Sequence, residues 1–154
     1  MDFYDWMLAL HLLAAFAIAS ALVLYSVLVF SGRRMTTLAE TRMLFRVAPV
    51  ATPLVAGGVL LVLILGIILA IDNDAYELWN GWIIVAIILW AAQAAVGQRT
   101  GKYYTDVQKL AESPDAVEAD VLARLRAPTG ARLHWATVAL FFLLLLDMIF
   151  KPGA

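Results

Sequence analysis

The sequence predicts an all-α membrane protein, built as one four-helix transmembrane bundle with both termini outside. Three observations support this fold class. The 154-residue chain is 64% hydrophobic and only 15% charged, whereas soluble domains are about 45–50% apolar and about 25% charged. The apolar residues gather in four long runs, and ten of the eleven Lys and Arg residues lie in two of the segments between these runs.

Each apolar run reaches or approaches the ~20 residues that a helix needs to cross the ~30 Å hydrocarbon core of a bilayer. The predicted spans are residues 6–30, 47–71, 79–96 and 133–150. The leader MDFYD is acidic where a signal peptide is basic, and the run behind it is longer than the apolar core of a signal peptide. We therefore expect the first run to be a retained span, and the whole chain 1–154 to form a single transmembrane domain.

The distribution of basic residues predicts the orientation of the bundle. The segment between the first two spans carries four arginines, and the segment between the last two carries six basic residues. The opposite side has the acidic leader, the segment IDNDAYELWN and the tail KPGA. Because basic loops stay in the cytoplasm, both long loops are predicted to be cytoplasmic. The lipid bilayer is the first partner that the sequence predicts.

Both cytoplasmic loops contain helix signals. Thr37 and Glu40 fit a capping box, so a helix is expected to start there, with a bend at Pro49 and Pro53 as the second span begins. In the other loop, Ser113 is a candidate N-cap before a proline, and an amphipathic helix is predicted over about residues 114–126. Its apolar face is expected to lie on the membrane surface or against the bundle, and consists of Val117, Val121, Leu122 and Leu125. A solvated linker helix is the alternative. The sequence shows no internal repeat.

Polar residues inside the spans sort by depth into two layers. In the outer layer, His11 lies about 9 Å inside the first span and Asp147 about 6 Å inside the fourth, at ~1.5 Å per helical residue. Equal depth predicts that the two side chains meet as a polar pair within the membrane. The alternative is that Asp147 reaches the outer headgroups or pairs with Lys151 one turn away.

The inner polar layer consists of Tyr25, Thr52 and Gln93, with Ser26 beside Tyr25. Gln93 belongs to a stripe at steps of three and four that predicts the inward face of the third span: Trp79, Trp82, Ala86, Trp90, Gln93 and Gly97. Small residues predict close helix contacts at Ala14 and Ala15 in the first span and at Gly57 and Gly58 in the second.

Motifs for catalysis are absent from the sequence. It has no cysteine, no HExxH, no Gly-rich phosphate loop and no basic patch interleaved with aromatic residues, so neither a metal site nor a nucleic-acid partner is predicted. His11 is predicted near the outer face of the membrane and His134 near the cytoplasmic face, more than about 20 Å apart, so they are not expected to hold one haem together. If His11 ligates haem, the second ligand must be another group, such as Met148 at the same level, or be absent.

Three short motifs carry a resemblance to known proteins: Leu10-His11, the stretch from Arg42 to Pro53, and Ile149-Phe150-Lys151-Pro152. Over nearly the whole chain they resemble an uncharacterised group of bacterial integral membrane proteins, domain of unknown function 2269. The chain is more distantly similar to the HemJ-type protoporphyrinogen oxidases, which share a first-span histidine, an Arg-rich approach to the second span and a terminal Lys-Pro. The resemblance implies a multi-pass protein of the bacterial cytoplasmic membrane and a haem b group at the position of His11.

The chain also departs from the HemJ pattern. That family has Trp-aromatic-Ala-Gly after the histidine, where this chain reads Ala17-Ile18-Ala19-Ser20, and a basic residue with a histidine opening the third span, where this chain reads Trp79-Asn80-Gly81-Trp82. No catalytic residue is therefore assigned. Two hypotheses remain. The first is a non-enzymatic assembly or binding module, acting with itself or with another membrane protein. The second is a haem-binding membrane oxidoreductase of degenerate HemJ type.

Overall fold

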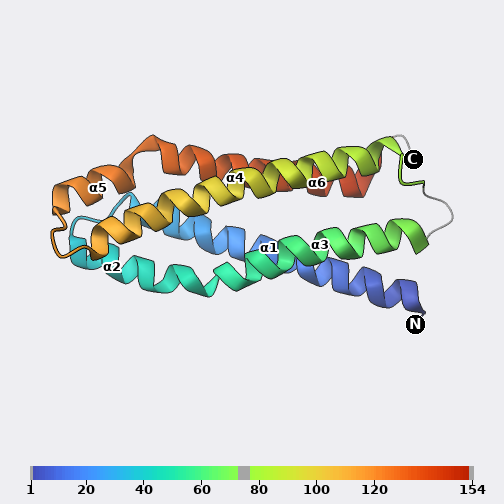
Figure 1. Cartoon of the computed structure of the whole chain (residues 1–154), viewed down its shortest axis with the longest axis horizontal. Coiled ribbons are helices and arrows are strands. Elements are labelled where there is room, and N and C mark those ends of the chain that lie inside the picture. Colours follow the sequence, from blue (N-terminus) through green and yellow to red (C-terminus); the bar gives the residue numbers. More distant parts are fainter. Residues whose placement is uncertain (1, 73–76, 153–154) are drawn as a thin grey trace.

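The computed structural model describes residues 2–72 and 77–152, and every regular element in these ranges is a helix. The long helices are α1 (Phe3–Gly32), α3 (Thr52–Asp72), α4 (Gly81–Glu112) and α6 (Pro128–Phe150). The short ones are α2 (Leu38–Val47), η1 (Ala48–Val50) and α5 (Glu118–Arg126). Figure 1 shows both ends of the chain at one end of the bundle and α2 and α5 at the other. The predicted all-α four-helix bundle is confirmed.

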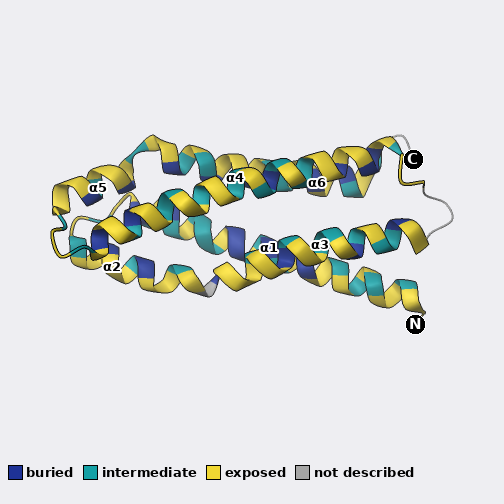
Figure 2. Cartoon of the chain, in the orientation of Figure 1, coloured by how far each residue is buried: buried dark blue, intermediate teal, exposed yellow. Residues whose placement is uncertain are grey.

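The surface of the bundle is apolar where a bilayer would surround it. Within the described residues, four helical stretches are long and apolar enough to cross a membrane, and they are built on α1, α3, α4 and α6. Their outward faces are exposed (Figure 2) and carry large apolar side chains such as Phe16, Ile88 and Phe142. A soluble protein rarely exposes so much contiguous apolar surface. The chain is therefore a multi-pass membrane protein.

The four long helices form two closely packed pairs. α1 packs along α3 and α4 packs along α6, and contacts between the two pairs are much sparser. Within the first pair, a Cβ atom on Gly58 would lie 3.1 Å from the carbonyl oxygen of Ala14 and 2.8 Å from Ile18 Cγ1. A Cβ on Gly57 would have nothing within 4 Å. The predicted close contact of small residues is confirmed at Gly58 and Ala14, but Gly57 does not contribute to it.

The predicted start of α2 is confirmed. The Thr37 hydroxyl accepts a hydrogen bond from the Glu40 N–H at 3.2 Å, and the Glu40 carboxylate accepts from the N–H groups of Thr36 and Thr37. These backbone hydrogen bonds hold the pKa of Glu40 below its usual value. After α2 the chain passes through the short 3-10 helix η1, which contains Pro49, before α3 begins. This 3-10 turn interrupts the α-helical pattern at the place where the bend was predicted.

The segment between α4 and α6 differs from the prediction at its start. α4 continues through Glu112, well beyond residue 96, and Ser113 ends α4 instead of opening the next helix. Pro114 disfavours a helical conformation at Ser113, which is extended with ψ 142°. α5 consequently begins at Glu118 rather than near residue 114. Its Leu125 packs against Phe45 and Val107 of the bundle, so α5 covers the bundle end.

The two halves of the chain repeat one architecture, although the sequence shows no repeat. Each half runs from a long helix through a short helix to a second long helix (Figure 1). At the end of the bundle that contains α2 and α5, the short helix of each half is hydrogen-bonded to the other half. Arg42 Nε of α2 donates to Ala111 O near the end of α4 at 2.7 Å, and Arg126 Nη2 of α5 donates to Met35 O just after α1 at 2.6 Å. Such charge-assisted hydrogen bonds tie each short helix to the opposite half.

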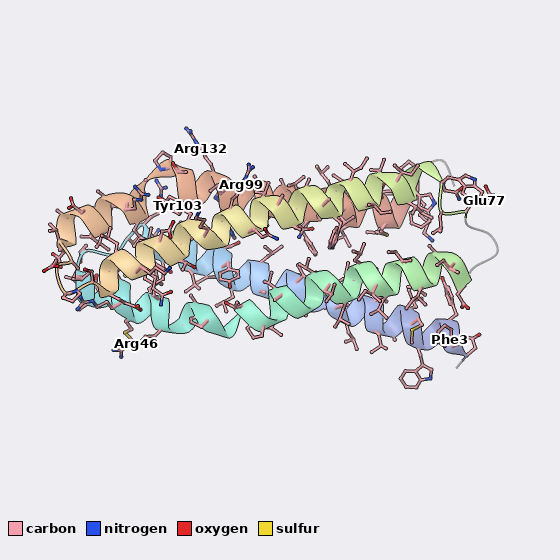
Figure 3. The ribbon with its side chains drawn as sticks, viewed as in Figure 1. Phe3, Arg46, Glu77, Arg99, Tyr103 and Arg132 are labelled. Carbon is pink, nitrogen blue, oxygen red and sulfur yellow. The ribbon has the colours of Figure 1, made fainter. Side chains whose placement is uncertain are left out.

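The orientation of the bundle is open to a direct labelling experiment. In Figure 3, Arg46, Arg99 and Arg132 lie in the half of the bundle away from Phe3 and Glu77. We expect single cysteines at positions 35 and 110 to be protected from an impermeant thiol reagent in intact cells, because basic loops stay in the cytoplasm. A cysteine at position 78 is the control and should be labelled. Labelling of position 35 or 110 from outside would contradict the predicted topology.

Candidate functional site

A hydrogen-bonded cluster joins α1 to α6 and to α3 within the inner polar layer. Ser26 Oγ donates to Leu22 O at 2.8 Å and also lies 2.8 Å from His134 Nε2. A hydroxyl has one hydrogen, so Nε2 of His134 is the donor in the second bond and His134 Nδ1 is left as an acceptor. On the neighbouring residue, the Tyr25 hydroxyl lies 3.2 Å from Thr52 Oγ1 on α3.

Gln93 is the most buried polar member of the predicted stripe on α4. It is only 6% exposed, yet its side-chain amide has no hydrogen-bond partner among the described residues. Trp82 and Ala86 of the stripe are also buried, whereas Trp79 is 72% exposed and lies off the packed face. Trp90 links the two helix pairs, because its indole Nε1 donates to Val59 O of α3 at 3.0 Å.

The outer polar layer is not assembled as a direct pair. His11 Nδ1 and Asp147 Oδ2 are both buried, and neither has a hydrogen-bond partner in the described part of the chain. Asp147 is 8% exposed, so it does not reach the headgroups either. No hydrogen bond joins the two side chains directly among the described residues, and their helices pair with different partners. His11 packs against Gly66 on α3, while α6 packs mainly along α4. A link through one water stays a prediction.

Two neighbouring cavities lie between the helix pairs. The outer one, of about 320 Å³, is lined almost wholly by apolar side chains, with His11, Trp90, Met148 and Lys151 on its wall. The inner one, of about 530 Å³, includes Tyr25, Thr52, His134 and Thr137. We call them the outer and inner chambers. Both are lined by Ile18, Val59, Gln93 and Ala94, which therefore mark their junction.

No charged side chain of the described residues lines the inner chamber. Its polar groups are hydroxyls, amides and the His134 imidazole. Tyr104 lines the same chamber with a phenol hydroxyl. The inner chamber is therefore polar without carrying a formal charge.

Sequence reasoning overlooked His134 and Thr137 as site residues. His134 was considered only as a haem ligand, yet it is 2% exposed and completes the hydrogen-bonded cluster. Thr137 Oγ1 lies 3.3 Å from Thr100 Oγ1 on α4. The two residues share a buried face of α6 with Leu144 and Asp147, at steps of three and seven. That spacing was the signal in the sequence that could have found them.

Asp147 provides a test of whether the unpaired carboxyl has a role. Replacing Asp147 with leucine should stabilise the protein in detergent by up to about 1 kcal/mol, because a buried polar group without a partner is removed. Asp147→Asn keeps a polar group of the same shape and should change the unfolding free energy less. Destabilisation by Asp147→Leu would instead show that the carboxyl has a partner, as the water-mediated link to His11 requires.

The fold and the apolar surface thus define a multi-pass, all-α membrane protein with two chambers between its helix pairs. Comparison with known proteins gave no match: no family model fits the chain, and no curated protein or solved structure is similar to it.

Proposed function

We propose that this chain is a non-enzymatic membrane module that binds a lipophilic small molecule in the two chambers. One observation carries the proposal: Gln93, 6% exposed and without a side-chain hydrogen bond among the described residues, lines both chambers at their junction. The Gln93 amide is not among the fully buried unpartnered atoms of the described residues, so it is accessible from the chambers, where a ligand could form a hydrogen bond with it. Self-assembly, or assembly with another membrane protein, stays a prediction.

The dimensions and chemistry of the chambers support a small-molecule ligand. Ligand sites are typically cavities of about 300–1,000 Å³ with mostly apolar walls and few polar groups. Each chamber falls within this range, at about 320 and about 530 Å³. The bacterial cytoplasmic membrane is the proposed location, supported by the basic loops and by the resemblance to bacterial membrane proteins.

Extraction of the purified protein tests the proposal. After extensive washing in nanodiscs, organic extraction should recover a lipophilic molecule in near-stoichiometric amount. Ala94→Phe fills the junction of the chambers and should abolish recovery, whereas Ala95→Phe on the exposed neighbouring position should retain it. Equal recovery from both variants, or no molecule enriched over bulk lipid, would overturn the proposed function.

A second candidate is the haem-binding oxidoreductase of degenerate HemJ type. It is favoured by the buried His11 Nδ1, which has no partner among the described residues although the ring lines the outer chamber. Met148 lines the same chamber, so its sulfur would hold the haem iron together with His11 if haem were bound. Bound haem b would supply a redox-active iron. His134 lines only the inner chamber and does not contribute.

The absorption spectrum distinguishes the two candidates. If haem is bound, protein expressed with a haem supply should show an intense Soret band that His11→Ala removes or shifts. Met148→Leu should alter the spectrum only if the sulfur is the second ligand. A preparation that contains a stoichiometric lipophile but no Soret band would leave the binding module and rule out the haem protein.

A further inference from the structure

The inner chamber selects against charged headgroups. Phospholipid heads carry phosphate, and proteins bind phosphate with Arg, Lys or clustered backbone N–H groups. The described lining of this chamber has none of these cations, and its polar groups are neutral. Placing an anionic head there would desolvate the charge without a cationic partner among the described lining residues. A ligand head in this chamber is therefore polar and uncharged.

The chamber offers both hydrogen-bond donors and acceptors to such a head. The Gln93 amide supplies two N–H donors and an acceptor oxygen. The hydroxyls of Tyr25 and Thr52 share one hydrogen bond, so one hydroxyl hydrogen stays available. His134 Nδ1 is an acceptor, because Nε2 donates to Ser26. A ligand head whose oxygens accept hydrogen bonds in its oxidised form and donate them in its reduced form would therefore find hydrogen-bond partners in this chamber in both forms.

The outer chamber suits an apolar tail continuing from that head. Its walls are aliphatic and aromatic, and it meets the inner chamber at Ile18, Val59 and Ala94. Trp90 closes part of this junction through its bond to Val59 O. Contacts between α3 and α4 are sparse, so a long molecule that enters from the bilayer between these helices would have to open the Trp90–Val59 hydrogen bond but no closely packed interface.

We infer that the ligand is a quinone or quinol with an apolar tail, its ring in the inner chamber bonded to Gln93 and its tail in the outer chamber. This inference rests on the proposed binding function and names its ligand class. Quinone carbonyls accept from the Gln93 amide and the Tyr25–Thr52 hydroxyl pair. Quinol hydroxyls donate to Gln93 Oε1 and His134 Nδ1.

The test compares two probes with the same tail. The protein in nanodiscs is titrated with decyl-benzoquinone and with decylbenzene, whose ring has no oxygens. Quinones quench indole fluorescence. Trp90 is bonded to Val59 O at the junction of the chambers, so a quinone ring bound on the inner side of this junction should quench it saturably. Decylbenzene does not quench in this way, so its binding is measured by calorimetry. We expect Gln93→Leu to weaken quinone binding about tenfold, the loss of roughly 1.4 kcal/mol, and to leave decylbenzene binding unchanged. Tyr25→Phe should weaken quinone binding severalfold.

The possible outcomes distinguish a failure of the quinone inference from a failure of the proposed lipophile-binding function. If both probes bind equally, or Gln93→Leu leaves the quinone Kd unchanged, the ligand class is wrong while lipophile binding stands. If the quinone does not bind but extraction recovers another lipophile that Ala94→Phe abolishes, the inference is likewise overturned. If neither probe binds and extraction recovers nothing, both proposals fail.

Discussion

Gly58→Leu is expected to destabilise the protein by about 1–3 kcal/mol, the usual cost of forcing extra volume into a packed interface. The reason is the approach of α1 to α3. A Cβ at this position would meet the backbone carbonyl oxygen of Ala14 at 3.1 Å and Ile18 Cγ1 at 2.8 Å. A side-chain atom can rotate away, but a helix carbonyl cannot, so α1 and α3 must separate. Unfolding with SDS in mixed micelles measures the change.

Gly57→Leu is the matched control, because it places the same side chain one residue away on the exposed face of α3. With nothing within 4 Å of its Cβ, the leucine would point into lipid. We expect its unfolding free energy to equal that of the parent protein or to exceed it slightly, since leucine favours a helix over glycine. Equal losses at both positions would contradict the close packing of α1 on α3.

Ser26→Ala is the second substitution with a large expected effect. It leaves the Nε2–H of His134 without a partner at a position that is 2% exposed. An orphaned buried donor costs about 1–3 kcal/mol. Ser20→Ala on the same helix is the control, because Ser20 is exposed and its change should be close to zero.

A double-mutant cycle shows whether the loss comes from the hydrogen bond itself. In a His134→Leu background no donor remains to be orphaned, so adding Ser26→Ala should cost less than it does alone. Interhelical hydrogen bonds in membrane proteins show coupling energies averaging about 0.6 kcal/mol and reaching about 1.7 kcal/mol. A value near the upper end is expected here, since the bond is 2.8 Å long. Strict additivity would contradict the assigned Ser26–His134 bond.

The sequence by itself determined the class of protein and the local signals along the chain. Spans were found because a bilayer demands about 20 apolar residues per helix, and that demand appears directly in composition. The start of α2 at Thr37 and Glu40 was found because a capping box involves only neighbouring residues. The polar layer containing Tyr25, Thr52 and Gln93 was found from depth, which follows from counting residues at ~1.5 Å each.

Only the tertiary structure decided which helices pair and which polar residues meet. Depth fixes a residue's height in the membrane but not the direction its side chain points around the helix axis. In a soluble helix the polar face would reveal that direction, but a membrane helix is apolar on both its lipid-facing and its bundle-facing sides. Equal depth therefore predicted a pair of His11 with Asp147. In the structure, the His11 side chain of α1 faces Gly66, and Ser26 of α1 lies within hydrogen-bond distance of His134. The partner of each helix is chosen by packing between small residues far apart in the chain, such as Ala14 and Gly58.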